Sequence, residues 1–206
     1  MRCSLRHEKN LRAQGCGSIG GIDEAGRGPL AGPVVAAVVI LPEKFRYKYL
    51  RDSKQLTANQ REHIYAELTG RSDVCWSAEV VDNEEIDRLN ILRASHEAMR
   101  RALARLARQP EHVLIDGWPV PQIPMAQTAL VGGDSLSFSI AAASVIAKVT
   151  RDRLMIEMDA RHPGYEFSHH KGYATALHLE RLKAHGPCPI HRRSFLPVAE
   201  TLLSLG

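Results

Sequence analysis

Two neighbouring strand-like segments near the start of the chain constrain its fold more than any other feature. Residues 34–41 are a continuous run of apolar, mostly β-branched side chains between Pro33 and Pro42. A run of this length and composition is typical of a buried strand and is far too short to cross a bilayer. Residues 19–24 are also typical of a strand, and a glycine-rich loop at 26–33 separates the two segments. We therefore predict an antiparallel pair of strands.

Sequence periodicity extends this pattern along the chain. Residues 57–68 are predicted to form a helix, because Thr57 is a suitable N-cap and Gly70 a suitable stop. Residues 84–108 repeat apolar side chains at helical spacing and end before Pro110. Further strands are predicted at 74–81 and 112–117, and further helices at 135–159, 174–184 and 196–205. Strands and helices in this order predict an α/β fold, a mixed β-sheet flanked by helices.

Size and composition indicate an ordinary globular protein. The chain has 206 residues, of which 44% are hydrophobic and 24% charged, enough to bury one core with a small appendage. We predict three parts: a flexible basic arm at 1–18, a main α/β domain at 19–173 and a C-terminal helical subdomain at 174–206. The arm lacks the apolar stretch of a secretory signal. The cysteines lie far apart, which argues against a zinc or disulfide framework and favours a reducing cytoplasm.

The charge distribution favours a polyanionic partner. The net charge is +4 and the pI is near 9.0. Between residues 161 and 194 the chain carries six lysines and arginines against two glutamates, together with six of the ten histidines. This segment is either a solvated, weakly charged tail or a surface that faces phosphates, and the excess of positive charge favours the second interpretation.

An acidic pair marks the end of the first predicted strand. Asp23 and Glu24 are adjacent, and residues 26–29 follow at once as Gly-Arg-Gly-Pro. Adjacent carboxylates repel each other and glycines weaken regular structure, so the segment is a poor structural element. It makes sense where the acids hold a cation and the loop must approach a ligand closely. The segment therefore predicts a metal-dependent site that acts on a phosphorylated substrate.

Two more acids occur in a similar context. Asp116 ends a predicted strand, and Asp134 follows two glycines at the start of a predicted helix. Carboxylates from neighbouring strand ends can converge at one edge of a sheet, and the helix dipole tolerates an acid at an N-terminus. Taken alone, Asp116 could equally be a turn residue and Asp134 an N-cap. The four oxygen donors suit Mg²⁺ or Mn²⁺ rather than zinc, and two such ions ~4 Å apart could clamp a phosphodiester.

The loop at 26–32 has the glycines of a nucleotide-binding loop but not its context. A phosphate-binding loop opens a helix, whereas here Pro33 and a predicted strand follow. The other use of such a loop is to present backbone N–H and C=O groups to a sugar. A 2′-hydroxyl both donates and accepts hydrogen bonds, and it distinguishes RNA from DNA. The loop is therefore a candidate for contact with a ribose.

Three further side chains are weaker candidates for contact with a substrate. Lys54 follows Asp52 and Ser53 in a segment that is more often a turn, although its ammonium could reach a phosphate. Tyr173 is either a half-buried residue of a helix-entry loop or a ring that stacks on a base or sugar. Arg192 belongs to a His-Arg-Arg cluster that is either a phosphate contact or ordinary surface.

Taken together, these segments resemble the bacterial ribonuclease HII family. The opening motif at 21–42, GIDEAGRGPLAGPVVAAVVILP, closely resembles that of the family. Further matching motifs follow in order: DSK at 52–54, IDRLNIL at 86–92, LIDG at 114–117, GD at 133–134, IAAASVIAKVTRD at 140–152, KGY at 171–173 and HRRSF at 191–195. The resemblance covers residues 19–200, nearly the whole chain.

The resemblance implies a ribonuclease H-like fold with a C-terminal helical extension. The implied activity is endonucleolytic cleavage of RNA in RNA/DNA hybrids and at ribonucleotides embedded in duplex DNA. By this resemblance, the four metal-binding acids of the family correspond to Asp23, Glu24, Asp116 and Asp134. The loop that contacts the 2′-hydroxyl corresponds to Gly26, Arg27 and Gly28, and the tyrosine at the RNA–DNA junction corresponds to Tyr173.

The expected mechanism is hydrolysis with two Mg²⁺ or Mn²⁺ ions, one activating water and the other stabilising the leaving 3′-oxygen. By resemblance, cleavage on the 5′ side of the ribonucleotide leaves a 3′-hydroxyl and a 5′-phosphate. We expect a cytoplasmic monomer that binds hybrid or ribonucleotide-containing duplexes and no membrane. Two alternatives stay open: a metal nuclease of the same fold with another substrate, and a hybrid-binding protein that does not cleave. The presence of all four acids argues against the second.

Overall fold

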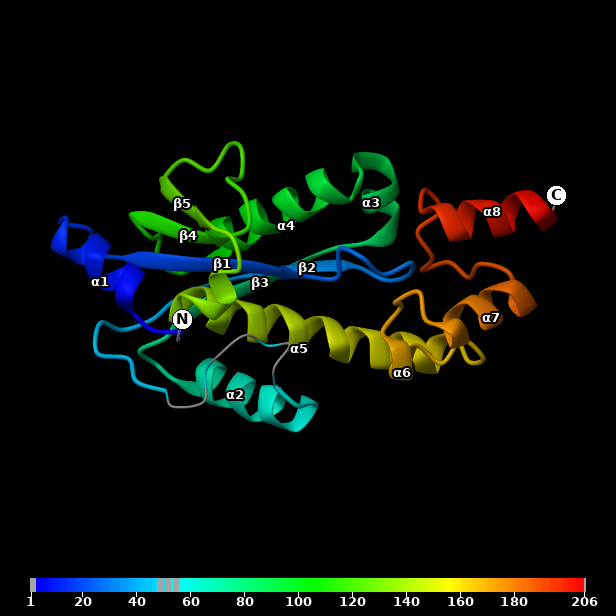
Figure 1. The fold of residues 1–206 in the computed structure, drawn as a ribbon, viewed down its shortest axis with the longest axis horizontal. Helices are drawn as coiled ribbons and strands as arrows, with labels where there is room; N and C mark the ends of the chain where they lie inside the picture. The colour runs from blue at the N-terminus through cyan, green and yellow to red at the C-terminus, as the bar shows by residue number, and fades with distance from the viewer. Residues whose placement is uncertain (1–2, 48–49, 51–52, 54–55, 206) are drawn as a thin grey trace.

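The computed structural model describes residues 3–47, 50, 53 and 56–205. Lys54, one of the weaker candidates for substrate contact, lies outside the described residues. Figure 1 shows a central sheet with helices on both of its faces. Within the described part of the chain, no helix is both long enough and apolar enough to cross a membrane.

The sheet is mixed and has five strands, in the order β3-β2-β1-β4-β5. The first three strands pair antiparallel, and the last two continue parallel to β1. Their bounds are β1 (Ile19–Ala25), β2 (Val34–Ile40), β3 (Cys75–Val81), β4 (His112–Asp116) and β5 (Ala126–Leu130). The predicted α/β class and the antiparallel pair at the start of the chain are confirmed.

The other regular elements of the described chain are helices and one 3-10 turn. Their bounds are α1 (Arg6–Ala13), α2 (Ala58–Gly70), α3 (Asn83–Leu89), α4 (Ile91–Arg105), the 3-10 turn η2 (Gly133–Ser135), α5 (Phe138–Arg161), α6 (Phe167–His170), α7 (Ala176–His185) and α8 (Leu196–Leu205). The helix predicted from Thr57 is confirmed as α2, and Thr57 caps it in a capping box with Gln60.

Burial of β2 on both faces explains the layers. All of its residues are buried, as its continuous apolar sequence predicts. Val38 belongs to the core cluster under α4, whereas Ala37 and Val39 belong to the cluster against α5 and α2. Accordingly, Figure 1 shows α3 and α4 above the sheet and α5 and α2 below it.

Small side chains at the start of α5 let this helix approach β1. Ala141, Ala142 and Ala143 are fully buried, in agreement with the close packing predicted from the small-residue stripe. At Gly21 in β1, a Cβ atom would lie 2.1 Å from the backbone carbonyl carbon of Ser139. The backbones of β1 and α5 are therefore in direct contact at Gly21, which fixes β1 against the beginning of α5.

The segment predicted as one helix forms two helices in the structure. The sequence predicts a single helix at 84–108, whereas the structure has α3 and α4, with a break at Asn90. Asn90 has a φ of 69°, in the left-handed region, and its side chain accepts a hydrogen bond from the Arg93 N–H at the start of α4. The apolar spacing continues across the break, so periodicity alone does not detect it.

The predicted flexible arm contains an ordered helix. In α1, Glu8 is buried, and its carboxylate accepts hydrogen bonds from the Ser137 hydroxyl at 2.6 Å and the Ser139 N–H at 2.9 Å. A carboxylate at the N-terminus of α5 satisfies backbone N–H groups and interacts favourably with the helix dipole. The segment Arg6–Ala13 is therefore part of the fold and not a mobile arm.

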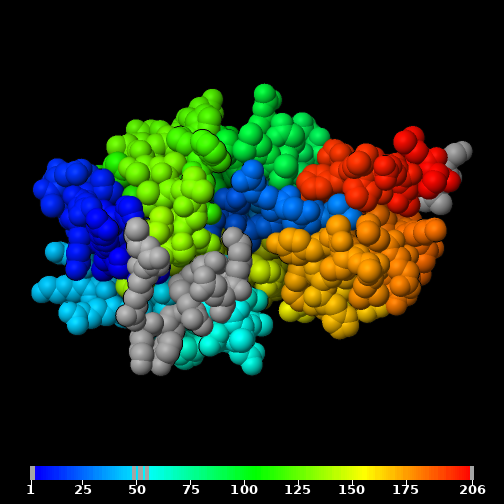
Figure 2. Space-filling view, viewed as in Figure 1, coloured from blue at the N-terminus to red at the C-terminus, as the bar shows by residue number. Residues whose placement is uncertain are grey.

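The C-terminal residues gather at one end of the molecule. Figure 2 shows them in orange and red, on the side opposite α1. Helices α7 and α8 follow the loop that carries Tyr173, as the sequence predicts. The division into a catalytic domain at 19–173 and a helical subdomain at 174–206 stays a prediction.

Candidate active site

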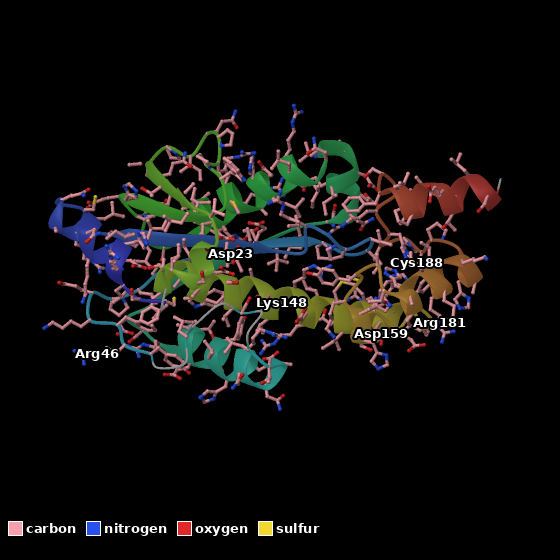
Figure 3. All side chains as sticks on the ribbon, viewed as in Figure 1. Asp23, Arg46, Lys148, Asp159, Arg181 and Cys188 are labelled. Carbon is pink, nitrogen blue, oxygen red and sulfur yellow. The ribbon has the colours of Figure 1, made fainter. Side chains whose placement is uncertain are left out.

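Three carboxylates converge at one edge of the sheet. Asp23 lies in β1, Asp116 ends β4 and Asp134 lies in η2, and one oxygen of each lies within 4.8 Å of the others. Because β1 and β4 run parallel with Ile22 opposite Ile115, the next residue of each strand is an aspartate at the same edge. Figure 3 labels Asp23 in β1, above the first turns of α5. The predicted convergence of these three acids is observed.

The glycines before Asp134 allow its approach. Gly132 has a φ of 67°, in the left-handed region that favours glycine. The N–H of Gly133 donates to Oδ1 of Asp116 at 2.6 Å, and a Cβ atom at Gly133 would lie 3.4 Å from the same oxygen. The pair of glycines thus brings the backbone of η2 against Asp116 and sets Asp134 beside it.

The structure decides between the alternatives left open for Asp116 and Asp134. Ser137 caps α5, because its hydroxyl accepts a hydrogen bond from the Ile140 N–H. Asp134 is therefore not the N-cap. A turn does follow Asp116, with Gly117 at a φ of 83°, but the Asp116 carboxylate lies with the other two acids.

Charge repulsion acts within this carboxylate triple. Asp23 is 5% exposed, and burial, followed by the charges of Glu24 and Asp116, raises its pKa well above the ordinary value of an aspartate. Hydrogen bonds from Ser144 and from the Glu24 N–H oppose this shift, the latter at 2.7 Å. A bound divalent cation would replace the repulsion between these carboxylates with attraction.

The donor set fits a hard divalent metal. The three carboxylates supply the oxygen ligands that Mg²⁺ and Mn²⁺ prefer. The Cys3 thiol donates to the backbone carbonyl oxygen of Asp134 at 3.8 Å, and among the described residues it is not one of the converging ligands. The chemistry of the residues present therefore favours Mg²⁺ or Mn²⁺ over zinc.

Glu24 lies beside the triple but is not one of its members. Successive side chains of a strand point to opposite faces, so Glu24 does not follow Asp23 into the cluster. Its carboxylate accepts a hydrogen bond from the Arg27 guanidinium at 3.2 Å. The role of Glu24 as a metal ligand stays a prediction.

Arg192 differs from its predicted role. The sequence leaves open a contact with phosphate, whereas the side chain is fully buried. Its guanidinium donates to four carbonyl oxygens of the loop after β1, those of Gly26, Arg27, Gly32 and Pro33, at 2.6–3.1 Å. Burial and these four acceptors exclude a direct phosphate contact in this conformation. Arg192 instead supports the loop from inside the molecule.

Arg151 supports the same loop from α5. It is also fully buried and donates to the carbonyl oxygens of Pro33 at 2.9 Å, Ala31 at 3.1 Å and Lys171 at 2.9 Å. The last of these bonds joins the loop after β1 to the segment that carries Tyr173. Arg151 therefore fixes the two candidate substrate-binding segments relative to each other.

Sequence reasoning missed Arg151, although a signal for it exists. In a helix, positions four residues apart share a face. Arg151 follows Ala147 at this spacing and thus continues the small-residue stripe that packs against the sheet. A charged residue on a buried helix face requires partners, and the carbonyl groups of a glycine-rich loop supply them. At Gly26, where φ is 101°, a Cβ atom would lie 2.1 Å from the Arg151 Nε, so this position requires glycine.

Tyr173 and Gly28 are neighbours on the outer side of the loop. A Cβ atom at Gly28 would lie 4.0 Å from a ring carbon of Tyr173, which is 42% exposed. The Lys148 ammonium lies 6.0 Å and the Arg151 guanidinium 5.8 Å from the centre of this ring. Figure 3 labels Lys148 on α5, beyond Asp23. An aromatic ring with cations nearby is a surface on which a sugar or base can stack.

The sheet order and the oxygen-only acid cluster define the class of the protein, a ribonuclease H-like metal-dependent nuclease. A family model described as Ribonuclease HII matches residues 20–198, and the chain belongs to this family. The predicted family, the ribonuclease H-like fold and the assignment as a ribonuclease H enzyme are confirmed.

Relatives and solved structures agree with this assignment. Ribonuclease HII of Xanthomonas oryzae pv. oryzae is 56% identical over 182 residues, which are 87% of this chain and 72% of that protein. Ribonuclease HII of Polaromonas sp. is 52% identical over 186 residues, 90% of this chain and 93% of that protein. The crystal structure of ribonuclease H2 from Pyrococcus horikoshii has a TM-score of 0.77 and 27% identity, covering 91% of this chain and 98% of that one.

Proposed function

We propose that this protein hydrolyses the phosphodiester on the 5′ side of a ribonucleotide, in RNA/DNA hybrids and in duplex DNA, with two Mg²⁺ or Mn²⁺ ions. The observation that carries the proposal is the convergence of Asp23, Asp116 and Asp134, since Asp23 lies in β1, the strand that leads into the loop at 26–28. A proposed metal ligand, Asp23, and the proposed sugar-binding loop at 26–28 thus lie next to each other in the sequence. We expect the protein to act as a monomer in the cytoplasm.

The acids would hold the ions, with Glu24 as a further ligand beside the triple. When bound, the ions supply an activated water and stabilisation of the leaving 3′-oxygen. The protein contributes fixed ligand geometry. The Gly133 N–H donates to the Asp116 carboxylate and the Glu24 N–H donates to the Asp23 carboxylate, so neither carboxylate has to be ordered when the substrate arrives.

The loop at 26–28 has the orientation that recognition of a sugar hydroxyl needs. Arg192 binds the carbonyl oxygens of Gly26 and Arg27 from inside the molecule. In a planar trans peptide the N–H points away from the C=O. The N–H groups of Arg27 and Gly28 therefore point away from Arg192, where they can donate to a 2′-hydroxyl beside the Tyr173 ring.

Discrimination by the 2′-hydroxyl gives the direct test of the substrate. A DNA duplex with one ribonucleotide should be cut in Mg²⁺ or Mn²⁺, while its all-DNA twin should be cut at least about 10³-fold more slowly, because a buried donor left unpaired is costly. Cleavage is measured on denaturing gels with both duplexes at equal concentration. Equal cutting of the two duplexes contradicts recognition of the ribose. Binding of the ribonucleotide duplex without cutting in either metal favours the non-cleaving hybrid binder.

The substitution Gly28→Ala tests the surface of the loop at 26–28 without disturbing the fold. The added methyl group has room, since the nearest atom is a ring carbon of Tyr173 at 4.0 Å, so the melting temperature should stay close to that of the wild type. The methyl group would occupy the space that a ribose needs between loop and ring. We expect kcat/KM on the single-ribonucleotide duplex to fall about 10²-fold. Unchanged cleavage with unchanged stability would place the sugar elsewhere.

A further inference from the structure

Three buried histidines lie directly behind Tyr173. His170, His178 and His191 are 7%, 0% and 1% exposed, so they cannot reach a substrate in this conformation. The rings of His170 and His178 stack with their centroids 4.3 Å apart, and those of His178 and His191 lie 5.2 Å apart. Figure 3 labels Cys188, which borders this group, close to α7. The metal-dependent chemistry of the carboxylate triple makes no use of these side chains.

The hydrogen bonds fix the proton positions of His191 and His178. Nδ1 of His191 lies 2.9 Å from the Cys188 amide nitrogen, 3.1 Å from the Cys188 thiol and 3.3 Å from the Cys188 carbonyl oxygen. The amide N–H is the shortest of these contacts and can only donate, so we assign the proton of this neutral ring to Nε2. That Nε2 lies 3.1 Å from Nε2 of His178, which must therefore accept. His178 consequently carries its proton on Nδ1, which donates to the Tyr173 carbonyl oxygen at 2.9 Å. The chain of hydrogen bonds runs in one direction, from the Cys188 amide to Tyr173.

His170 holds the backbone just before Tyr173. The Gly172 N–H donates to Nδ1 of His170 at 3.1 Å, and Nε2 of His170 therefore donates to the Tyr165 carbonyl oxygen at 2.8 Å. Gly172 has a φ of 82°, and a Cβ atom there would lie 2.4 Å from the Ala31 carbonyl oxygen. The segment is thus held between neutral imidazoles on one side and the loop after β1 on the other.

Neutral rings are required for this arrangement. Burial lowers the pKa of His178 and of His191 to about 4, so both are uncharged at pH 7. A second proton on His178 would set two N–H groups against each other across the 3.1 Å between the rings. The directed chain therefore exists only while both rings stay neutral.

A zinc site made of Cys188, His178 and His191 does not explain the group. Both nitrogens of His191 are engaged, Nδ1 with the amide and the thiol of Cys188 and Nε2 with His178. Among the residues that the structure describes, the only set of three or more potential ligands that converges is the carboxylate triple. The histidines are therefore arranged to orient each other and the backbone, and not to surround an ion.

We propose that His178 and His191 are positioning residues that set the place of the Tyr173 ring beside the loop at 26–28. They act through the Tyr173 carbonyl, which His178 holds from inside the molecule. The inference rests on the proposed function, in which this ring meets the ribonucleotide. The Tyr173 side chain is 42% exposed, so a shift of its backbone would change the contact that its ring can make with the sugar.

A double-mutant cycle with Tyr173→Ala tests whether His178 acts through Tyr173. His178→Gln removes the donor at the Nδ1 position, and we expect kcat/KM on the single-ribonucleotide duplex to fall about tenfold, the equivalent of one neutral hydrogen bond. In the Tyr173→Ala background the same change should have less than about a twofold effect. His178→Asn is the matched control, because its amide nitrogen can replace Nδ1 as donor and should restore most of the rate.

If the double variant loses the product of the two single-variant losses in kcat/KM, His178 does not act through Tyr173 and the positioning role is overturned. A His178→Asn variant as slow as His178→Gln would overturn it as well. If the wild type cuts the ribonucleotide duplex and its all-DNA twin equally, the proposed function itself fails, whatever the cycle shows. If the variants do not fold, ¹⁵N NMR of the imidazoles in the wild type at pH 7 decides. The expected spectrum has the proton of His178 on Nδ1 and that of His191 on Nε2, and the opposite tautomers overturn the proposal.

Discussion

Asp116→Asn is expected to slow cleavage by about 10³-fold or more while leaving the fold intact. The amide has the size of the carboxylate, and its oxygen can still accept the hydrogen bond from the Gly133 N–H, which is 2.6 Å long in the wild type. What is lost is one of the negative charges that would hold the proposed metal ions. The measurement is single-turnover cleavage of a duplex with one ribonucleotide at saturating enzyme.

Thermal melting with and without metal supplies a second readout for Asp116→Asn. Mg²⁺ or Mn²⁺ should raise the melting temperature of the wild type, because the folded state alone presents the converged acids, and should raise that of the variant less. The matched control is Asp73→Asn, the same chemical change at an exposed acid that pairs with Arg71 at 2.8 Å. The control should cleave at the wild-type rate. An Asp116→Asn variant within tenfold of the wild type would contradict the assigned role of this acid.

Gly21→Ala is expected to destabilise the fold strongly, although it adds only one methyl group. The new Cβ atom would lie 2.1 Å from the Ser139 carbonyl carbon and 2.4 Å from the Ile140 nitrogen, both backbone atoms of a buried helix start. Neither β1 nor α5 can move away without disturbing the sheet or the carboxylate triple. We expect a loss of about 3 kcal/mol or more in the free energy of unfolding, measured by urea denaturation.

Gly70→Ala is the control for this substitution. Gly70 ends α2, and no atom lies within 4 Å of the position that its Cβ would take. Alanine in a helix reduces the entropy of the unfolded chain, so stability should stay within about 1 kcal/mol of the wild type, on the stabilising side. A Gly21→Ala variant as stable as Gly70→Ala would show that β1 and α5 can separate, against the backbone contact between Gly21 and Ser139.

Local patterns predict the strands and acids because their causes are local. A continuous apolar run such as 34–41 has to be buried on both faces, which places β2 inside the sheet. Asp23 and Asp116 end apolar segments, and the parallel register of β1 and β4 brings such ends together. In the fold, burial raises the pKa of Asp23, and the repulsion from Glu24 that makes adjacent acids unusual in a sequence adds to this rise.

The features that sequence reasoning missed depend on partners far along the chain. Glu8 is ordered because it caps α5, and nothing near Glu8 in the sequence indicates that contact. Arg192 carries the same charge as a surface arginine, and only the fold shows that the carbonyls of the loop after β1 surround it. The break at Asn90 depends on one residue with a left-handed backbone, inside a pattern whose apolar spacing continues. The edge strand β5 has partly exposed residues and therefore a weak apolar pattern.

We expect water, placed by metal ions on the carboxylate triple, to attack the phosphorus on the 5′ side of the ribonucleotide. Cleavage in H₂¹⁸O, with end-group analysis by mass spectrometry, measures both the nucleophile and the position of attack. The predicted result is a 3′-hydroxyl on the upstream deoxynucleotide and one ¹⁸O atom in the 5′-phosphate of the ribonucleotide. A 2′,3′-cyclic phosphate would contradict this expectation, because the 2′-hydroxyl of the ribose and not water would then be the nucleophile. A cut on the 3′ side of the ribonucleotide would contradict the position of attack, whichever nucleophile made it.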